Sequence, residues 1–138
     1  MPAPIPAFSA AWADAFRHAV NADEAYREAG RRWADPVALI VRPTTELPDG
    51  AAVQVHLEGG TCTEAAAVAL DTVSAPFILA ASLATWREIV EGRVDPIAAV
   101  TRGAVSVARG SIGTLMLHAR AARSLLACAQ KIDTLWPV

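Results

Sequence analysis

The chain has 138 residues, of which 54% are hydrophobic and 19% charged, and its net charge is −2 at pH 7. A chain of this length buries roughly 68% of its unfolded surface on folding, so it can form a core without disulfides or metals. The 12 basic residues are spread among 14 acidic ones, which excludes the basic stripe of nucleic-acid-binding proteins. The longest uncharged run, Thr72–Trp86, contains Pro76 and is shorter than the roughly 18 to 20 residues of a membrane-spanning helix.

We expect residues 1–138 to form a single domain, with a Pro-rich N-terminal tail over residues 1–7. The first residues carry no positive charge, and their prolines argue against the apolar helix of a signal peptide, so a cytoplasmic location is predicted. In a reducing compartment Cys62 and Cys128 should be free, buried thiols. The mean hydropathy of +0.32 is high for a small domain and indicates that apolar surface is enclosed or shared with a partner.

Residues 8–33 have the pattern of an amphipathic helix with aromatic side chains on one face. The segment Asn21–Glu24 has the form of a capping box, which predicts two helices or one helix kinked near Asn21. We expect the aromatic face to pack on a sheet; contact with a membrane is the alternative, but the polar face has no excess of cations. Val37–Val41, rich in β-branched residues, is predicted to be a strand.

A β-hairpin is predicted where residues 51–58 and 61–70 flank a Gly-Gly pair that suits a type I′ turn. A simple two-residue turn places Val55 opposite Glu64. In that register Glu64 lies on the apolar face of the hairpin, where an unpaired charge is costly.

The stretch from Ala75 to Gly110 predicts a strand, a helix, a short helix and a second strand. Phe77–Ala81 is too short for a helix and suits a buried strand, and the alternation of residues 104–110 suits another. The helices between them are bounded by residues typical of helix ends: Ser82, Gly92, Asp95 with Pro96, and Gly103.

The C-terminal residues, about Ile112 to Ile132, are predicted to form one long helix that begins after Ser111. Its arginines cluster on one side, and His118 lies near the middle of the apolar side. The complete order of elements predicts an α+β fold with a five-stranded, mainly antiparallel sheet and helices packed on one of its faces.

The spacing in the central stretch resembles the lipid-transfer domain of the sterol carrier protein type 2 family. The resemblance is carried by an ordered series of residues that continues over most of the chain: Trp86, Ile89, Gly92, Asp95, Pro96, Ala99, Gly103, Val105, Val107 and Gly110. It identifies the chain as a small, stand-alone member of bacterial type. It also implies an apolar tunnel between the sheet and the helices.

The resemblance and the helical pattern together suggest which residues line that tunnel. The predicted ligand-binding residues are Glu64, Phe77, Leu79, Trp86, Ile89, Val90, Val105, Val107, Leu115, His118 and Leu125.

No nucleotide-binding, zinc-protease or serine-hydrolase motif occurs in the sequence. We therefore predict no cofactor, no metal site and no catalytic residues. The expected partner is a hydrophobic small molecule (a lipid, fatty acyl chain, acyl-CoA or sterol-like molecule) that is bound or transferred without covalent chemistry. Transient membrane contact and homo-oligomer formation are compatible with this function. The alternative is an accessory or oligomerising domain, or a small enzyme acting on a bound hydrophobic substrate.

Glu64 and His118 are the two ionisable residues expected on apolar faces. They are either satisfied polar groups of the core, with a bulge as one way to turn Glu64 outward, or they line the tunnel and contact the polar group of the ligand.

Overall fold

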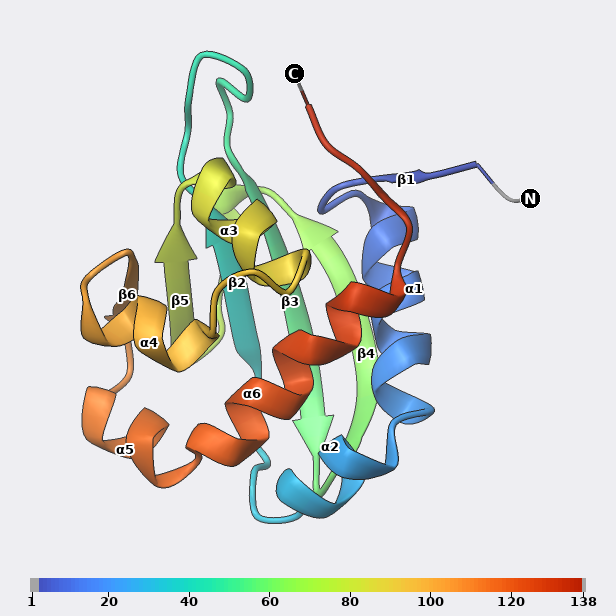
Figure 1. Cartoon of the computed structure of the whole chain (residues 1–138), viewed down its shortest axis with the longest axis vertical. Helices are drawn as coiled ribbons and strands as arrows, with labels where there is room; N and C mark the ends of the chain where they lie inside the picture. Colours follow the sequence, from blue (N-terminus) through green and yellow to red (C-terminus); the bar gives the residue numbers. More distant parts are fainter. Residues whose placement is uncertain (1–2, 138) are drawn as a thin grey trace.

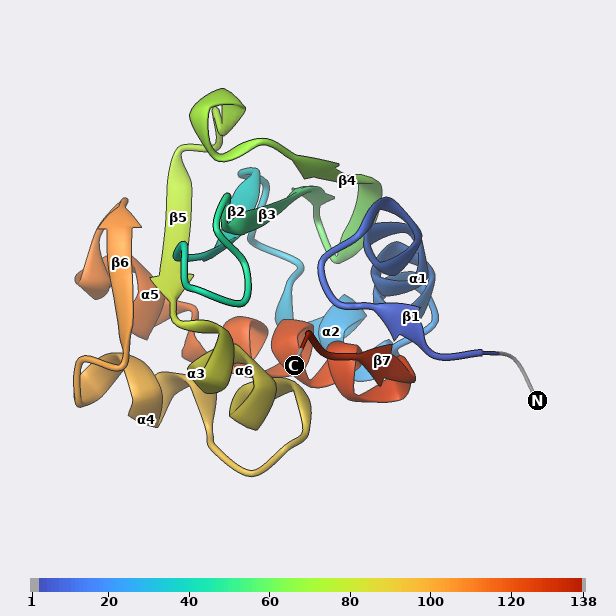
Figure 2. The ribbon, with the colours of Figure 1, turned by 90° about the horizontal axis from the view of Figure 1, so that it is seen from above.

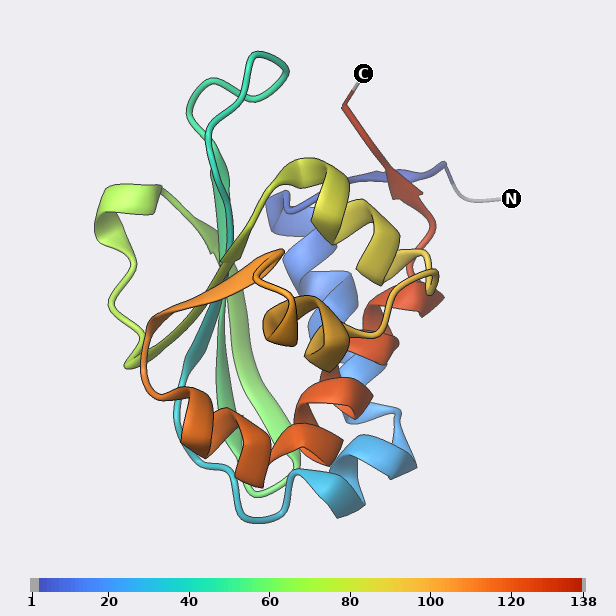
Figure 3. The same ribbon diagram turned by 60° about the vertical axis from the view of Figure 1, so that its left-hand side comes forward.

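A computed structural model describes residues 3–137, in which a five-stranded sheet carries helices on one face (Figures 1 and 3). The strands of this sheet are β2 (Val37–Val41), β3 (Ala51–Glu58), β4 (Thr61–Val68), β5 (Phe77–Ala81) and β6 (Val105–Arg109). The helices are α1 (Ala10–Asn21), α2 (Glu24–Ala29), α3 (Leu83–Val90), α4 (Pro96–Thr101), α5 (Ile112–Leu117) and α6 (Ala119–Ala127). Two 3₁₀ turns, η1 (Leu70–Thr72) and η2 (Cys128–Lys131), follow β4 and α6.

The sheet has the strand order β4-β3-β2-β5-β6. Only β2 and β5 run parallel to each other, and the other neighbours are antiparallel, which confirms the predicted α+β fold and mainly antiparallel sheet. Alternate side chains point toward the helices and are buried, as Val37, Leu39 and Val41 do in β2. This apolar face is the floor of the core.

The aromatic helix α1 packs along β4 at one edge of the sheet, as Figure 1 shows. Ser9 caps it by accepting a hydrogen bond from the Trp12 N–H. Trp12 and Phe16 are fully buried, with their rings stacked at 5.4 Å between centroids. The predicted break near Asn21 is confirmed, although Asp23 and not Asn21 caps α2.

Asn21 instead joins the end of α1 to β4. Its Nδ2 donates to the Cys62 carbonyl at 2.9 Å, and its Oδ1 accepts from the Cys62 N–H at 2.7 Å. The side-chain amide thus replaces a neighbouring strand at the sheet edge and satisfies two backbone groups that would otherwise be unpaired.

The hairpin register departs from the prediction after its first residues. Leu57 faces Cys62 as expected, but the next pair is His56 with Glu64, because one extra residue, Thr63, forms a bulge in β4. A shift of one residue moves every later side chain to the opposite face, so Glu64 is exposed to solvent. The simple two-residue register is wrong, and the alternative in which a bulge turns Glu64 outward is confirmed.

The stretch from β5 to β6 follows the sequence prediction closely. The Ser82 and Asp95 side chains accept hydrogen bonds from the first turns of α3 and α4, and Gly92 and Gly103 adopt positive φ values of 79° and 84° after those helices.

The predicted long C-terminal helix is interrupted at His118. This residue has φ −110° and ψ 26°, ends α5 and precedes α6. Figure 3 shows the change of direction between α5 and α6. Leu115 of α5 and Leu125 of α6 are both buried in the core.

Beyond α6, the chain ends in a short strand, β7 (Thr134–Leu135), which pairs in parallel with β1 (Ile5–Pro6). Figure 2 shows the two strands side by side, outside the main sheet. The Trp12 indole N–H donates to Thr134 Oγ1 at 3.0 Å, which fastens this pair to α1.

Replacing Asn21 with alanine should lower the free energy of unfolding by roughly 1 to 3 kcal/mol, since both Cys62 backbone groups lose their partner. The control is Glu64→Ala, on the same strand as Cys62. This substitution should change the free energy of unfolding by less than about 0.5 kcal/mol because Glu64 is exposed. Urea denaturation of both variants measures this difference. A larger loss for Glu64→Ala than for Asn21→Ala would contradict the register described here.

Candidate functional site

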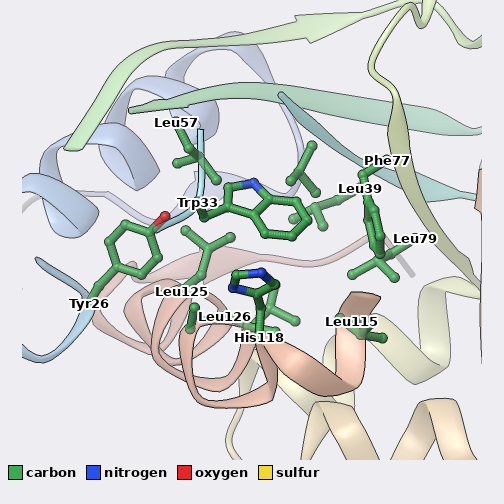
Figure 4. A pocket seen from close by; sticks show the side chains of 13 residues that line it. Tyr26, Trp33, Leu39, Leu57, Phe77, Leu79, Leu115, His118, Leu125 and Leu126 are labelled. Carbon is green, nitrogen blue, oxygen red and sulfur yellow. The ribbon is translucent and has the colours of Figure 1, made fainter. Parts of the chain in front are cut away.

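An apolar pocket lies between the sheet and the α5–α6 segment (Figure 4). Its volume is about 40 Å³. The sheet forms one wall, α5 and α6 the other, and α2 with the following loop closes one end. The lining residues are Tyr26, Trp33, Val37, Leu39, Leu57, Phe77, Leu79, Leu115, His118, Ala121, Ala122, Leu125 and Leu126.

A second, smaller pocket of about 10 Å³ lies beneath α3 and α4. It shares four lining residues with the first pocket: Leu79, Leu115, Ala122 and Leu126. The two spaces are therefore parts of one seam along which the sheet and the helices meet.

At the surface, a wider hollow of about 300 Å³ lies between the α3–α4 connection and α6. It shares Ile89, Pro96 and Leu126 with the second pocket, so the seam reaches the surface here. Asp95 and Arg123 also line the hollow and form an ion pair at 2.9 Å. Partial burial acts to raise the pKa of Asp95, but the hydrogen bond from the Ala98 N–H and the pair with Arg123 lower it overall.

The structure brings most of the predicted lining residues to this seam. Phe77, Leu79, Leu115, His118 and Leu125 line the first pocket, and the second is lined by Leu79 and Leu115 with Trp86, Ile89 and Val105. Trp86 is 1% exposed, and its indole N–H donates to the Ile40 carbonyl at 2.7 Å.

Three predicted residues do not line these pockets. Val90 is buried in the core, Val107 is half-buried on β6, and Glu64 is exposed on the opposite side of the hairpin. The bulge at Thr63 therefore separates Glu64 from His118, and the two residues do not form a pair.

Two polar side chains, Tyr26 and His118, interrupt the apolar walls of the first pocket. The His118 ring meets the Trp33 ring edge-on, with 5.0 Å between centroids, and Trp33 meets Phe77 in the same way at 5.3 Å. The Trp33 N–H is already satisfied, since it donates to the Asp35 carbonyl at 2.7 Å.

The Tyr26 hydroxyl is a buried polar group without a partner. The residue is 1% exposed, and within residues 3–137 its oxygen has no hydrogen-bond partner. Figure 4 shows the hydroxyl pointing toward Trp33 and Leu57, across the pocket. Burial raises the pKa of Tyr26 to about 12, with smaller contributions from Cys62 and Cys128, so the hydroxyl keeps its proton at neutral pH.

A volume of 40 Å³ holds at most about three water molecules, whereas pockets for small molecules occupy about 300 to 1,000 Å³. The pocket is therefore too narrow for such a ligand in this structure, which we call the closed state. Leucine and alanine side chains from α5 and α6 form the wall opposite the sheet.

No protein-family model matches the chain, and no curated protein sequence matches it. A search of solved structures does find close relatives. A crystal structure of sterol carrier protein 2 shares 39% of residues with this chain at a TM-score of 0.87, over 91% of this chain and 98% of the other. The chain belongs to the sterol carrier protein 2 family. The predicted resemblance is confirmed.

A bacterial relative has the same degree of similarity. The solution structure of a conserved hypothetical protein from Thermus thermophilus, itself suggested to be a sterol carrier protein, is 37% identical at a TM-score of 0.87, over 97% of this chain and 94% of the other. Sterol carrier protein 2 from Yarrowia lipolytica in its apo form is 14% identical over 86% of this chain and 88% of the other, with a TM-score of 0.56. The Yarrowia lipolytica protein shares the fold of this chain.

Two further findings concern membrane-spanning helices and metal sites. Among the described helices, none is both long and apolar enough to cross a membrane. Within residues 3–137, no three His, Cys, Asp or Glu side chains are close enough together to hold a metal ion.

Sequence reasoning placed Tyr26 and Trp33 only on the core side of an amphipathic segment and did not assign them to the ligand site. The pattern of the helix indicates which side is buried. It does not indicate that the Tyr26 hydroxyl is left unpaired, because that depends on side chains from β3, α6 and the loop before β2.

The two free thiols provide a test of how well the core is closed. Burial raises the pKa of Cys62 from 9.0 to about 11 and that of Cys128 to about 12. Native protein at pH 8 should therefore react with iodoacetamide far more slowly than unfolded protein, as mass spectrometry would show. Rapid modification of both thiols without denaturant would mean that the core opens readily.

The same pKa shifts predict how stability depends on pH. Above about pH 9 the thiols ionise in the unfolded chain while they stay protonated in the folded one, so the free energy of unfolding should fall as the pH rises toward 11 to 12. Urea denaturation at pH 8 and pH 10, with Cys62→Ala as the control, measures this loss.

Proposed function

We propose that this sterol carrier protein 2 family member binds a lipid or another ligand with a long apolar chain in the seam between the sheet and the helices. The observation that carries the proposal is the almost entirely apolar lining of the first pocket, which continues through shared residues to the second. Each methylene removed from water contributes about 0.8 kcal/mol, so about ten methylenes contribute about 8 kcal/mol before the costs of binding are subtracted.

Ligand entry requires the pocket to widen. We infer that α5 and α6 move away from the sheet, because they provide the wall opposite it and meet at the non-helical residue His118. The floor consists of hydrogen-bonded strands and is the less deformable side. The measured affinity would then include the cost of opening, as for any protein whose binding-competent state is a minor one.

The polar group of the ligand is proposed to accept a hydrogen bond from Tyr26. A hydroxyl that is buried and unpaired in the closed state gains a partner when an ester, carboxyl or hydroxyl oxygen enters. The first pocket has no Arg or Lys in its lining, which favours a neutral oxygen over a carboxylate.

The proposed function is binding and transfer without covalent chemistry. In the described part of the chain, the carboxylates that form ion pairs do so with other residues, and none pairs with His118 to orient it as a general base. A cytoplasmic location and the possibility of homo-oligomers remain predictions.

Protein purified from cells should carry apolar ligand, which native mass spectrometry and solvent extraction would detect. After delipidation it should take up a fluorescent fatty acid methyl ester at about one molecule per chain. Leu126→Arg, which places a charge where the two pockets meet, should abolish uptake. A homogeneous ligand-free mass together with no uptake by folded, delipidated wild type would refute lipid binding.

Replacing Tyr26 with phenylalanine should stabilise the ligand-free protein, since a buried unpaired hydroxyl is removed, and should weaken binding of an oxygen-bearing ligand. We expect a loss of roughly 2- to 10-fold in affinity for a pyrene-labelled fatty acid methyl ester. A pyrene-labelled alkane is the control, because it has no oxygen and should bind both proteins equally. Equal affinity of both proteins for the ester would remove Tyr26 from the ligand site.

A further inference from the structure

The outer side of α5 exposes large apolar side chains. Ile112 is 56% exposed, Met116 40% and Leu117 85%, and we call these three residues the α5 face. They are three of the four exposed large hydrophobic residues in the described part of the chain; the fourth, Leu135 in β7, is 52% exposed. Isolated exposed apolar residues are common in proteins, but three on one six-residue helix form a patch that usually has a partner.

The inner side of the same helix is also apolar, because Leu115 is 3% exposed and lines both pockets. Packing in the core therefore accounts for Leu115 but not for the α5 face. Figure 1 shows α5 at the corner of the molecule, beside α4 and β6 and away from α1.

The charged residues of the segment that contains α5 have one sign. Residues 96–132 contain five of the twelve Lys and Arg residues of the chain and none of its fourteen Asp and Glu residues. Within residues 3–137, Arg123 and Lys131 form ion pairs, whereas Arg109 and Arg120, on either side of α5 in the chain, form none. A chain with a net charge of −2 thus has a cationic segment centred on its most exposed apolar residues.

We propose that the α5 face docks on the surface of an anionic lipid bilayer. Its three apolar side chains enter the boundary between head groups and acyl chains, and Arg109 and Arg120 lie near the lipid phosphates. This combination of an apolar wedge and flanking cations is what anionic membrane surfaces bind. A second copy of the chain fits less well, because a two-fold contact through this face would bring the same arginines together.

Membrane docking is distinct from lipid binding in the pocket, since it depends on the α5 face and on Arg109 and Arg120, none of which lines the pocket. Membrane docking would also affect the pocket. Leu115 lies on the inner side of α5 and His118 ends the helix, so a docked α5 holds one wall of the pocket against the membrane.

The test is flotation of delipidated protein with vesicles of phosphatidylcholine alone or of phosphatidylcholine and phosphatidylglycerol at 3:1. Wild type should bind the anionic vesicles and lose binding as salt is added. Met116→Ser with Leu117→Ser should weaken this binding at least about tenfold. Leu135→Ser, which removes an equally exposed apolar side chain elsewhere, should leave it unchanged.

A charge variant gives a second measurement that does not alter the apolar face. Arg120→Gln should weaken binding to anionic vesicles about fivefold, whereas Arg31→Gln, beyond the end of α2, should not. Binding of a fluorescent fatty acid methyl ester in solution, without vesicles, should stay as in wild type for every variant, which separates membrane docking from ligand binding. Circular dichroism checks that each variant is folded.

Three results would overturn the proposal. The first is a wild-type protein that does not bind anionic vesicles. The second is a serine variant that binds them as well as wild type does. The third is a wild-type dimer in analytical ultracentrifugation that the Leu117→Ser substitution dissociates, since this would assign the α5 face to a second copy.

Discussion

The apolar face of the five-stranded sheet must be covered, and the cover provided by α5 and α6 is incomplete. The strands β2, β3 and β5 present Leu39, Leu57 and Leu79 to helices that leave a narrow seam instead of a fully packed core. Protein interiors are normally packed as densely as organic crystals, so unfilled space on an apolar floor lowers stability. A ligand that fills the seam recovers these contacts, which makes binding and completion of the core the same physical event.

The β4 edge of the sheet is firmly held, in contrast to the part that lines the pocket. On one side α1 stacks its aromatic rings over β4, and Asn21 satisfies the backbone of Cys62. The pocket end differs, because His118 is not helical and the Tyr26 hydroxyl has no partner. An unpaired polar group raises the free energy of the closed state. The free-energy difference between the closed state and an open or ligand-bound state is therefore smaller. The fold thus concentrates its packing defects where a ligand is proposed to enter.

Local signals in the sequence were sufficient for the α+β fold and for the stretch from β5 to β6, because Ser82, Gly92 and Asp95 act on their immediate neighbours. Two features are not determined by local signals. The bulge at Thr63, which was only one of two alternatives for Glu64, and the break at His118 both depend on what packs against them from distant parts of the chain. The helical pattern placed Leu115 and His118 at the site, but the role of Tyr26 depends on an absent hydrogen bond, for which a sequence has no signal.

The most direct test of ligand binding in the seam is NMR of protein with ¹³C-labelled leucine methyl groups, mixed with a long-chain fatty acid methyl ester. We expect nuclear Overhauser effects between the acyl chain and Leu39, Leu79 and Leu126, which line the two pockets. Contacts confined to the exposed methyl groups of Leu117 and Leu135 would place the ligand on the surface and contradict the account.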